Sequence, residues 1–217
     1  MLEVEDALPL VAAEWMDAGA DKPTVLVYGH LDLQLVPEPE WETNPHEAVR
    51  KGDRLYARGA ADDMGGWVSH MAALRAWFEE AGTLPCNVRL VIEGEEEIGS
   101  PNLERYMDAY PDAFEADLMV LTDCEALDAG GHSGLWGGSD GGGLERRGLA
   151  LHPEGRGLRG GGPGLGDLPL ILDGVMDLAT TAHGPNESLH LGVFRKAIAA
   201  DVYLLDEIGA LGKDGLG

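Results

Sequence analysis

The sequence has few basic residues and very few cysteines. Its 217 residues include 15 lysines and arginines against 39 aspartates and glutamates, which gives a formal net charge of −24. Such a surface repels the phosphates of nucleic acids and of anionic membranes, so we expect no nucleic acid and no membrane as a partner. The cysteines are Cys86 and Cys124, and two cysteines do not make a disulfide framework.

Long apolar runs are also missing. No stretch approaches the ~18 residues of a membrane-spanning helix, and no charged-then-apolar signal stands at the N-terminus. Together with the low cysteine content, these absences predict a soluble, cytoplasmic protein. The 44% hydrophobic content is still sufficient for a core, which excludes disorder of the whole chain.

Short β-branched runs alternate with helical patterns along the chain. Residues 62–80 place apolar side chains at three- and four-residue spacing, which predicts a helix whose Met and Trp stripe packs in the core. We expect Ser100 and Asn186 to cap two later helices. The alternation predicts an α/β fold with a mainly parallel, mixed sheet and flanking helices. The expected strands are residues 24–28, 88–92, 117–122 and 168–172, with an edge strand within 1–17 and a hairpin over 51–58.

Histidine and acidic side chains follow directly after three of these strands. His30 and Asp32 follow the first, four glutamates at 93 and 95–97 follow the second, and Asp123 follows the third. Because ligands gather at the carboxyl ends of parallel strands, we expect these side chains to lie together. Four close carboxylates repel one another, and no lysine or arginine lies within the run. A divalent metal is the natural counter-ion.

Nitrogen and carboxylate ligands without thiolates suit zinc, manganese or cobalt at a hydrolytic centre. Each motif alone also has a structural explanation. His30 and Asp32 could form a hydrogen-bonded pair, Asp62 and Asp63 could be acidic residues at a helix N-terminus, and the glutamates could be a solvated face. It is their joint occurrence that favours a metal site. The remaining histidines outside the motifs are assigned to surface or packing positions: His46, His70, His152 and His190.

Six short motifs occur in one order along the chain. They are G-H-L-D-L at 29–33, A-R-G-A-A-D-D-M-G-G at 57–66, E-G-E-E-E-I-G-S at 93–100, L-T-D at 121–123, H-S-G-L-W-G-G at 132–138 and A-H-G-P-N-E-S at 182–188. This series resembles the aminoacylase and carnosinase-type family of dinuclear zinc metallopeptidases, and most closely its cytosolic non-specific dipeptidase branch. The similarity is dense over residues 5–125, patchy over 126–167, and returns over 168–208.

The resemblance implies roles for individual residues. Glu96 would be the general base on a metal-bridging water, and Asp32 would orient the imidazole of His30. His132 would stabilise the oxyanion from a separate lid domain. Two divalent ions, zinc or alternatively manganese or cobalt, would share Asp62 and be held by five residues: His30, Asp62, Glu97, Asp123 and His183.

The chain departs from the family pattern in two places. Met64 stands where the family usually has a lysine, so a positive charge beside the site is missing. The lid domain, which in the family lies between the Asp123 and His183 motifs, is largely deleted. Residues 129–167 hold 16 of the 32 glycines and are expected to be a flexible remnant of it. We therefore expect the N-terminal part of a zinc-peptidase-like catalytic domain over 1–128 and its C-terminal part over 168–210.

These observations predict a metal-dependent amide or peptide hydrolase, a metallopeptidase of dipeptidase type that acts on a small peptide. Two alternatives stay open. One is an N-acyl-amino-acid deacylase with an acyl-amino-acid substrate, and the other is a catalytically weak or inactive metal-binding remnant of the family. Family dimers form through the lid, so a dimer of that type is not expected and the oligomeric state is open.

Overall fold

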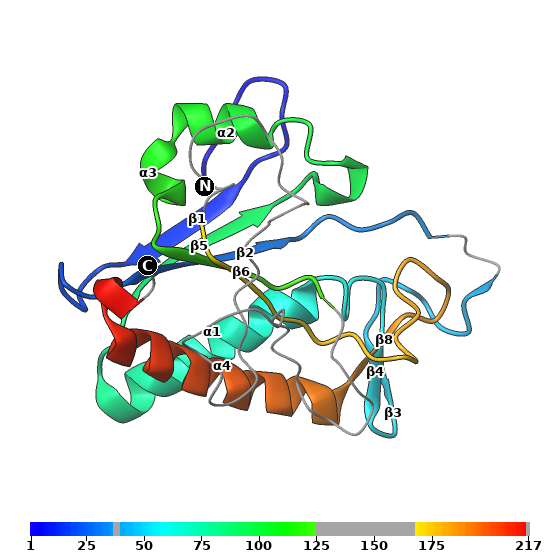
Figure 1. The fold of residues 1–217 in the computed structure, drawn as a ribbon. Helices are drawn as coiled ribbons and strands as arrows, with labels where there is room; N and C mark the ends of the chain where they lie inside the picture. Colours follow the sequence, from blue (N-terminus) through cyan, green and yellow to red (C-terminus); the bar gives the residue numbers. More distant parts are fainter. Residues whose placement is uncertain (37–39, 125–167, 216–217) are drawn as a thin grey trace.

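The computed structural model describes residues 1–36, 40–124 and 168–215, and its centre is a five-stranded sheet with helices on both faces (Figure 1). The strands are, in spatial order, β1 (Val11–Trp15), β5 (Asn87–Glu93), β2 (Thr24–His30), β6 (Leu118–Leu121) and β7 (Leu170–Leu172). The edge strand β1 runs antiparallel to β5, whereas all other neighbours in this sheet are parallel. The predicted α/β class with a mainly parallel, mixed sheet is confirmed.

Two pairs of helices cover the two faces of this sheet. The helices α1 (Met64–Ala81) and α4 (Leu191–Leu211) pack against each other on one face, and α2 (Leu103–Ala109) and α3 (Pro111–Phe114) lie on the other (Figure 1). Within the described residues, no helix combines the length and apolar composition that crossing a membrane requires.

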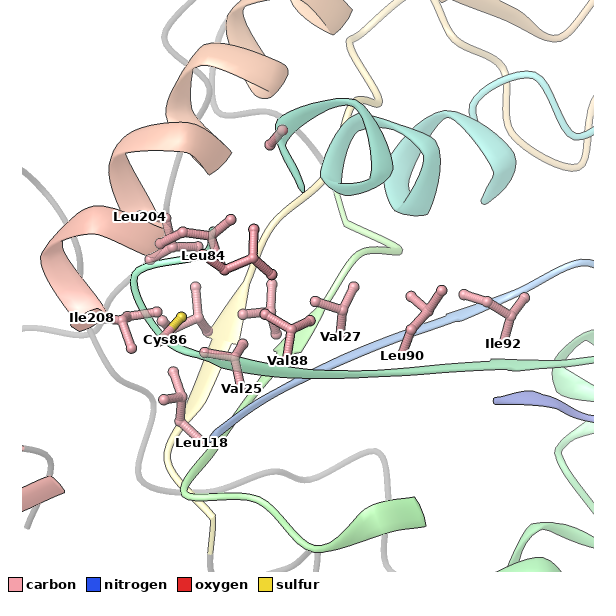
Figure 2. Close-up of a cluster of buried hydrophobic side chains, with 14 residues drawn as sticks. Val25, Val27, Leu84, Cys86, Val88, Leu90, Ile92, Leu118, Leu204 and Ile208 are labelled. Carbon is pink, nitrogen blue, oxygen red and sulfur yellow. The ribbon is translucent and has the colours of Figure 1, made fainter. Parts of the chain in front are cut away.

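The central strand β2 is buried along its whole length and contributes to two cores. Val25 and Val27 pack into the core on the α1 and α4 side, where Figure 2 shows them in one cluster with Cys86, Val88 and Leu204. Leu26 and Tyr28 alternate with them and pack into the core under α2 and α3. A strand buried on both faces explains why the sequence reads here as a continuous apolar run. Burial of each such aliphatic side chain stabilises the fold by about 1.5–3 kcal/mol.

The buried face of α1 differs from the predicted one. Met64 and Met71 of the predicted stripe are 36% and 41% exposed. The helix passes so close to the end of β6 that a Cβ on Gly66 would collide with the carbonyl oxygen of Thr122. Small and polar residues therefore face the interior, whereas Trp67, Leu74 and Trp77 of the predicted stripe are half-buried and pack against the core as expected. The buried residues of α1 are Gly65, Gly66, Ser69, His70 and Ala73.

A second, antiparallel sheet lies beside the start of α4. It contains β3 (Val49–Lys51), β4 (Arg54–Tyr56) and β8 (Ser188–His190), in that order. The hairpin of β3 and β4 agrees with the predicted one over 51–58. Because β4 pairs with β8, this sheet ties the first half of the chain to residues 168–215.

Both predicted helix caps are wrong. The N-cap of α4 is His190, whose Nδ1 accepts hydrogen bonds from two backbone amides of the first turn at 3.0 and 3.3 Å. Asn186 lies before β8, and its side chain accepts from the backbone amide of Glu42 at 2.9 Å. The earlier helix α2 begins after Asn102, while the hydroxyl of Ser100 donates to Glu93 at the end of β5.

Residues 168–215 belong to the same layers as the N-terminal part, since β7 pairs with β6 and α4 packs on α1. The glycine-rich segment 129–167, which we expect to be the lid remnant, lies outside the described residues.

Candidate metal centre

The expected ligands gather at the carboxyl ends of the parallel strands, as the sequence predicts. His30 is the last residue of β2, and Asp123 lies two residues beyond β6. The turn after β5 forms the 3₁₀ helix η2 (Glu96–Ile98), which carries two of the glutamates. The loops before α1 and before β8 supply the two remaining side chains, Asp62 and His183.

Asp62 lies between two histidines. Its Oδ1 is 3.1 Å from Nε2 of His30, and its Oδ2 is 2.8 Å from Nε2 of His183. Each histidine also faces a second carboxylate. Nε2 of His30 is 3.8 Å from Oδ2 of Asp123, and Nε2 of His183 is 3.2 Å from Oε2 of Glu97. The five expected ligands thus form two nitrogen and oxygen sets that share the Asp62 carboxylate.

Asp32 connects His30 to the glutamate turn. Its Oδ1 and Oδ2 accept hydrogen bonds from the backbone amides of Glu96 and Glu97 at 3.2 and 2.9 Å. The same Oδ1 is 3.4 Å from Nδ1 of His30. The carboxylate therefore lies against the ring nitrogen that faces away from Asp62, and it also fixes the backbone from which Glu96 and Glu97 project.

The four glutamates after β5 have two different environments, one bonded to protein donors and one facing the centre. Glu93 accepts hydrogen bonds from the hydroxyls of Tyr28 and Ser100, and burial raises the pKa of Glu93 to about 7. Glu95 accepts from a backbone amide of the N-terminal segment at 2.9 Å and from Asn102 at 2.8 Å. These two glutamates are satisfied by protein donors, so the expectation that a metal neutralises the whole run is wrong for them. The other two face the centre.

The electrostatics of the centre call for positive charge. Burial acts to lower the pKa of His30, but its hydrogen bond to Asp62 and the charges of Asp63 and Asp123 outweigh burial and raise the pKa to about 10. Burial raises the pKa of Asp123 to about 6, and the charge of Asp62 adds to the shift. Burial also raises the pKa of Glu96, although the charge of His30 acts against it.

The donor chemistry fits divalent ions. Imidazoles and carboxylates without thiolates suit zinc, manganese or cobalt at a hydrolytic centre. A divalent cation bound among these carboxylates would relieve the repulsion that a single imidazolium balances only in part. Two overlapping groups have ligand atoms within 4.8 Å of one another: His30, Asp62 and Glu97, and His30, Glu96 and Asp123.

Glu187 positions the Asp62 loop, and sequence reasoning assigned it no role. It is fully buried, and its Oε1 accepts from the backbone amides of Ala61 and Asp62 at 3.0 and 3.2 Å. Its Oε2 accepts from the backbone amide of Gly59 at 3.1 Å and from Nη1 of Arg58 at 2.8 Å. Four donors on one carboxylate fix the backbone at the shared ligand.

Arg58 extends this network to the second histidine. Its Nη2 donates to the backbone carbonyls of His183 and Gly184 at 3.1 and 3.2 Å. The guanidinium also lies over the ring of Trp41, 5.4 Å from the ring centre. Arg58 and Glu187 are 129 residues apart, so the sequence gives no direct sign that they form an ion pair. Their positions inside two of the six motifs are the only feature of the sequence that marks them.

Two further polar residues support the centre. Gln34 donates to Oε2 of Glu97 at 2.7 Å, the oxygen that also faces the second histidine. Asp63 accepts from the Thr122 hydroxyl at 2.6 Å and from the backbone amide of His30 at 3.3 Å. Burial raises the pKa of Asp63 well above its usual range. These contacts hold the ends of β2 and β6 against the start of α1.

His132, the expected oxyanion residue, lies outside the described residues. Met64 occupies the first turn of α1 as expected and brings no charge to the centre. Side-chain donors do approach the ligands: Gln34 donates to the Glu97 carboxylate, Arg58 to the His183 carbonyl and the Trp67 indole to the His30 carbonyl.

Imidazoles and carboxylates that converge at the carboxyl edge of a mainly parallel sheet define an α/β protein with a candidate metal centre. The family model described as Peptidase family M20/M25/M40 matches residues 26–134. The chain belongs to this family. The matched range contains the His30, Asp62, Glu97 and Asp123 motifs, while the His183 motif lies beyond it.

Individual relatives agree with this family. A cysteinylglycine-S-conjugate dipeptidase of Corynebacterium striatum is 31% identical over 162 residues, which cover 63% of this chain and 35% of the relative. The β-Ala-His dipeptidase of Homo sapiens is 35% identical over 125 residues, which cover 54% of this chain and 24% of the relative. The chain thus spans about a third or less of the length of these curated relatives.

Solved structures show the same fold. An M20 family metallo-carboxypeptidase, Sso-CP2 from Sulfolobus solfataricus, superposes with a TM-score of 0.55 and 38% identity, over 61% of this chain and 30% of that one. A tripeptidase from Staphylococcus aureus superposes over 93% of this chain with a TM-score of 0.59, and at 13% identity it supports the fold alone.

Proposed function

We propose that this chain is a metal-dependent peptide hydrolase of dipeptidase type that uses two divalent ions. The observation that carries the proposal is the position of Asp62, with one oxygen toward His30 and the other toward His183. The dipeptidase relatives support a small peptide as substrate, and the low cysteine content supports a cytoplasmic location. We assign residues 1–128 and 168–210 to one catalytic domain.

Two sets of residues would hold the ions. His30, Asp62 and Asp123 would hold one, and Asp62, Glu97 and His183 would hold the other. Zinc fits these donors, with manganese or cobalt as alternatives. When bound, such ions lower the pKa of a coordinated water and polarise a carbonyl oxygen.

Glu96 is the residue to which we assign proton transfer. It lies on η2 beside the ligands, within 4.8 Å of ligand atoms of His30 and Asp123. Its carboxylate would take a proton from the water that attacks the scissile carbonyl and would deliver it to the departing amine. Asp32 would hold the Glu96 backbone and the His30 ring in place for this step. His132 would add an oxyanion donor.

Hydrolysis and metal binding on the same samples test this proposal. Zinc or manganese is titrated into chelator-stripped full-length protein, and turnover is followed on a panel of dipeptides and N-acyl amino acids. We expect two ions that depend on Asp62, dipeptide turnover, and a loss of about 10²–10⁴-fold in kcat for Glu96→Gln with both ions retained. Glu104→Gln, an exposed glutamate on α2, is the matched control.

The alternatives predict other outcomes. Turnover of acyl amino acids without dipeptide turnover would identify a deacylase. Bound ions without any turnover would identify an inactive family remnant. The proposal is contradicted if neither ion binds.

A further inference from the structure

A second cluster of metal-ligand side chains lies in the interior and shares no residue with the candidate centre. His70 lies on α1, Asp173 directly follows β7, and Asp201 lies on α4. Their side chains are buried, with residue exposures of 2%, 2% and 0%. The prediction that His70 is merely a surface or packing residue therefore misses its two acidic neighbours.

Each carboxylate is anchored by one oxygen and presents the other to His70. Oδ1 of Asp173 accepts from the amide of Gly174 at 2.8 Å, and Oδ2 of Asp201 accepts from the Ser69 hydroxyl at 2.7 Å. The remaining oxygens, Oδ2 of Asp173 and Oδ1 of Asp201, have no hydrogen-bond partner among the described residues. They lie 3.3 and 3.6 Å from Nε2 of His70.

These spacings fit ligands of a common ion better than hydrogen bonds. An N–H···O hydrogen bond is about 2.9 Å long. Ligands about 2.0–2.1 Å from a tetrahedral zinc ion lie about 3.3–3.5 Å from one another. All three ligand atoms fall within 4.8 Å of one another, so one ion can reach them together.

Two adjacent buried carboxylates also require positive charge. Both can be ionised in the interior only with positive charge beside them, from a bound cation or from a protonated His70, and otherwise they must share a proton. Two unpartnered oxygens and an imidazole nitrogen within 4.8 Å of one another supply the donors of a cation site, with the nitrogen and oxygen chemistry that zinc, manganese and cobalt accept.

We propose that His70, Asp173 and Asp201 bind one divalent cation of the zinc type at a structural site separate from the catalytic centre. The site is buried under α1 and α4, so a substrate cannot reach it. It takes one ligand from residues 1–124 and two from residues 168–215. The bound ion therefore ties β7 and α4 to α1 and stabilises the joint between the two described parts of the chain.

Metal counting on three variants of the full chain tests this site. Chelator-stripped protein is loaded with zinc, freed of excess zinc by gel filtration, and its zinc content per chain is measured. We expect three ions in the unaltered chain, two in Asp201→Asn and one in Asp62→Ala. The Asp201→Asn change keeps the size of the side chain and an acceptor for the Ser69 hydroxyl. Asp177→Asn removes a largely buried acid elsewhere, with a side chain that is 6% exposed, and should retain all three ions.

Thermal unfolding gives a second readout that does not depend on Asp201→Asn folding. Asp62→Ala, with the catalytic centre disabled, should unfold at a temperature higher by several degrees with zinc than without it, and His70→Gln in the same background should abolish that shift. An Asp201→Asn or His70→Gln protein with the same zinc content as its parent would overturn the proposal. A zinc-independent Tm of Asp62→Ala would also overturn it and would indicate a shared proton. An unaltered chain that binds the His70-dependent ion but no ion that depends on Asp62 would contradict only the catalytic proposal.

Discussion

Glu187→Gln perturbs the candidate centre without replacing any of the expected ligand side chains. The side chain of Glu187 and that of its partner Arg58 are 0% and 1% exposed, with Oε2 and Nη1 2.8 Å apart. Solvent screening is therefore negligible at this pair. Removal of one charge leaves the buried guanidinium uncompensated, which costs about 3–5 kcal/mol.

Hydrogen bonding adds to this cost. Both carboxylate oxygens of Glu187 accept from donors, two backbone amides at Oε1 and a backbone amide with Arg58 at Oε2. In glutamine one of the two oxygens becomes an NH₂ group, which then faces two N–H donors and has no acceptor. A buried donor without an acceptor costs about 1–3 kcal/mol. We expect Glu187→Gln to lower the free energy of unfolding by at least about 3 kcal/mol.

Urea unfolding of the metal-free protein, followed by circular dichroism, measures this change. Zinc titration of the folded variant measures a second one. Because Glu187 holds the Asp62 amide and, through Arg58, the His183 carbonyl, zinc affinity should fall about 10–100-fold. The exposed control Glu104→Gln should change stability by less than about 0.5 kcal/mol. A loss below about 1 kcal/mol with unchanged zinc affinity would refute the reasoning.

Three further predictions follow from individual contacts. Asp32→Asn should weaken zinc binding about 10–100-fold in calorimetric titration while the chain stays folded, because it loosens the histidine and the glutamate turn together. Gly66→Ala should destabilise the fold by about 1–3 kcal/mol or more in urea unfolding, since the added Cβ collides with the Thr122 carbonyl. Burial alone would raise the pKa of Asp177, but hydrogen bonds from Arg54 outweigh it and hold the pKa below its usual value of 3.8. That contribution to stability is present above the unfolded-state pKa and is lost as pH falls through the lower folded-state pKa, so Asp177→Asn should flatten the acid side of the stability curve between about pH 2 and 5.

A different result would contradict each of these three predictions. Zinc affinity in Asp32→Asn equal to that of the unaltered chain would remove the orienting role. Gly66→Ala with unchanged stability would mean that α1 does not approach β6 so closely. Its control is Gly94→Ala, where the added Cβ would lie 3.4 Å from its nearest neighbour, the Pro9 carbonyl oxygen, which is an ordinary contact. An unchanged acid slope in Asp177→Asn would show that its ion pair with Arg54 contributes nothing.

The strand ends could be predicted from sequence because their signal is local. The apolar runs mark strands buried on both faces, and polar residues directly after them must lie at the carboxyl edge of a parallel sheet. His30, Asp123 and the glutamates of η2 were found in this way. The position of Asp62 before α1 and of His183 before β8 came from motifs instead.

The predictions that were wrong or missing share one physical reason. Each depends on how closely two segments that are distant in the sequence approach each other in the fold. Hydrophobic periodicity favours large residues, whereas the closeness of α1 to β6 demands small ones such as Gly66. Capping by His190 depends on β8, a strand of three residues that pattern analysis did not find. The roles of Glu187 and of His70 depend on contacts with residues more than 100 positions away in the sequence. Spacing along the chain cannot predict such contacts.

The shared carboxylate is the central claim, and zinc counting on single-ligand variants tests it most directly. Calorimetric titration of zinc into metal-free protein is compared for His30→Ala, His183→Ala and Asp62→Ala. Each histidine variant should lose one ion, whereas Asp62→Ala should lose two, because both donor sets use its oxygens. Loss of only one ion, or of none, in Asp62→Ala would contradict the account.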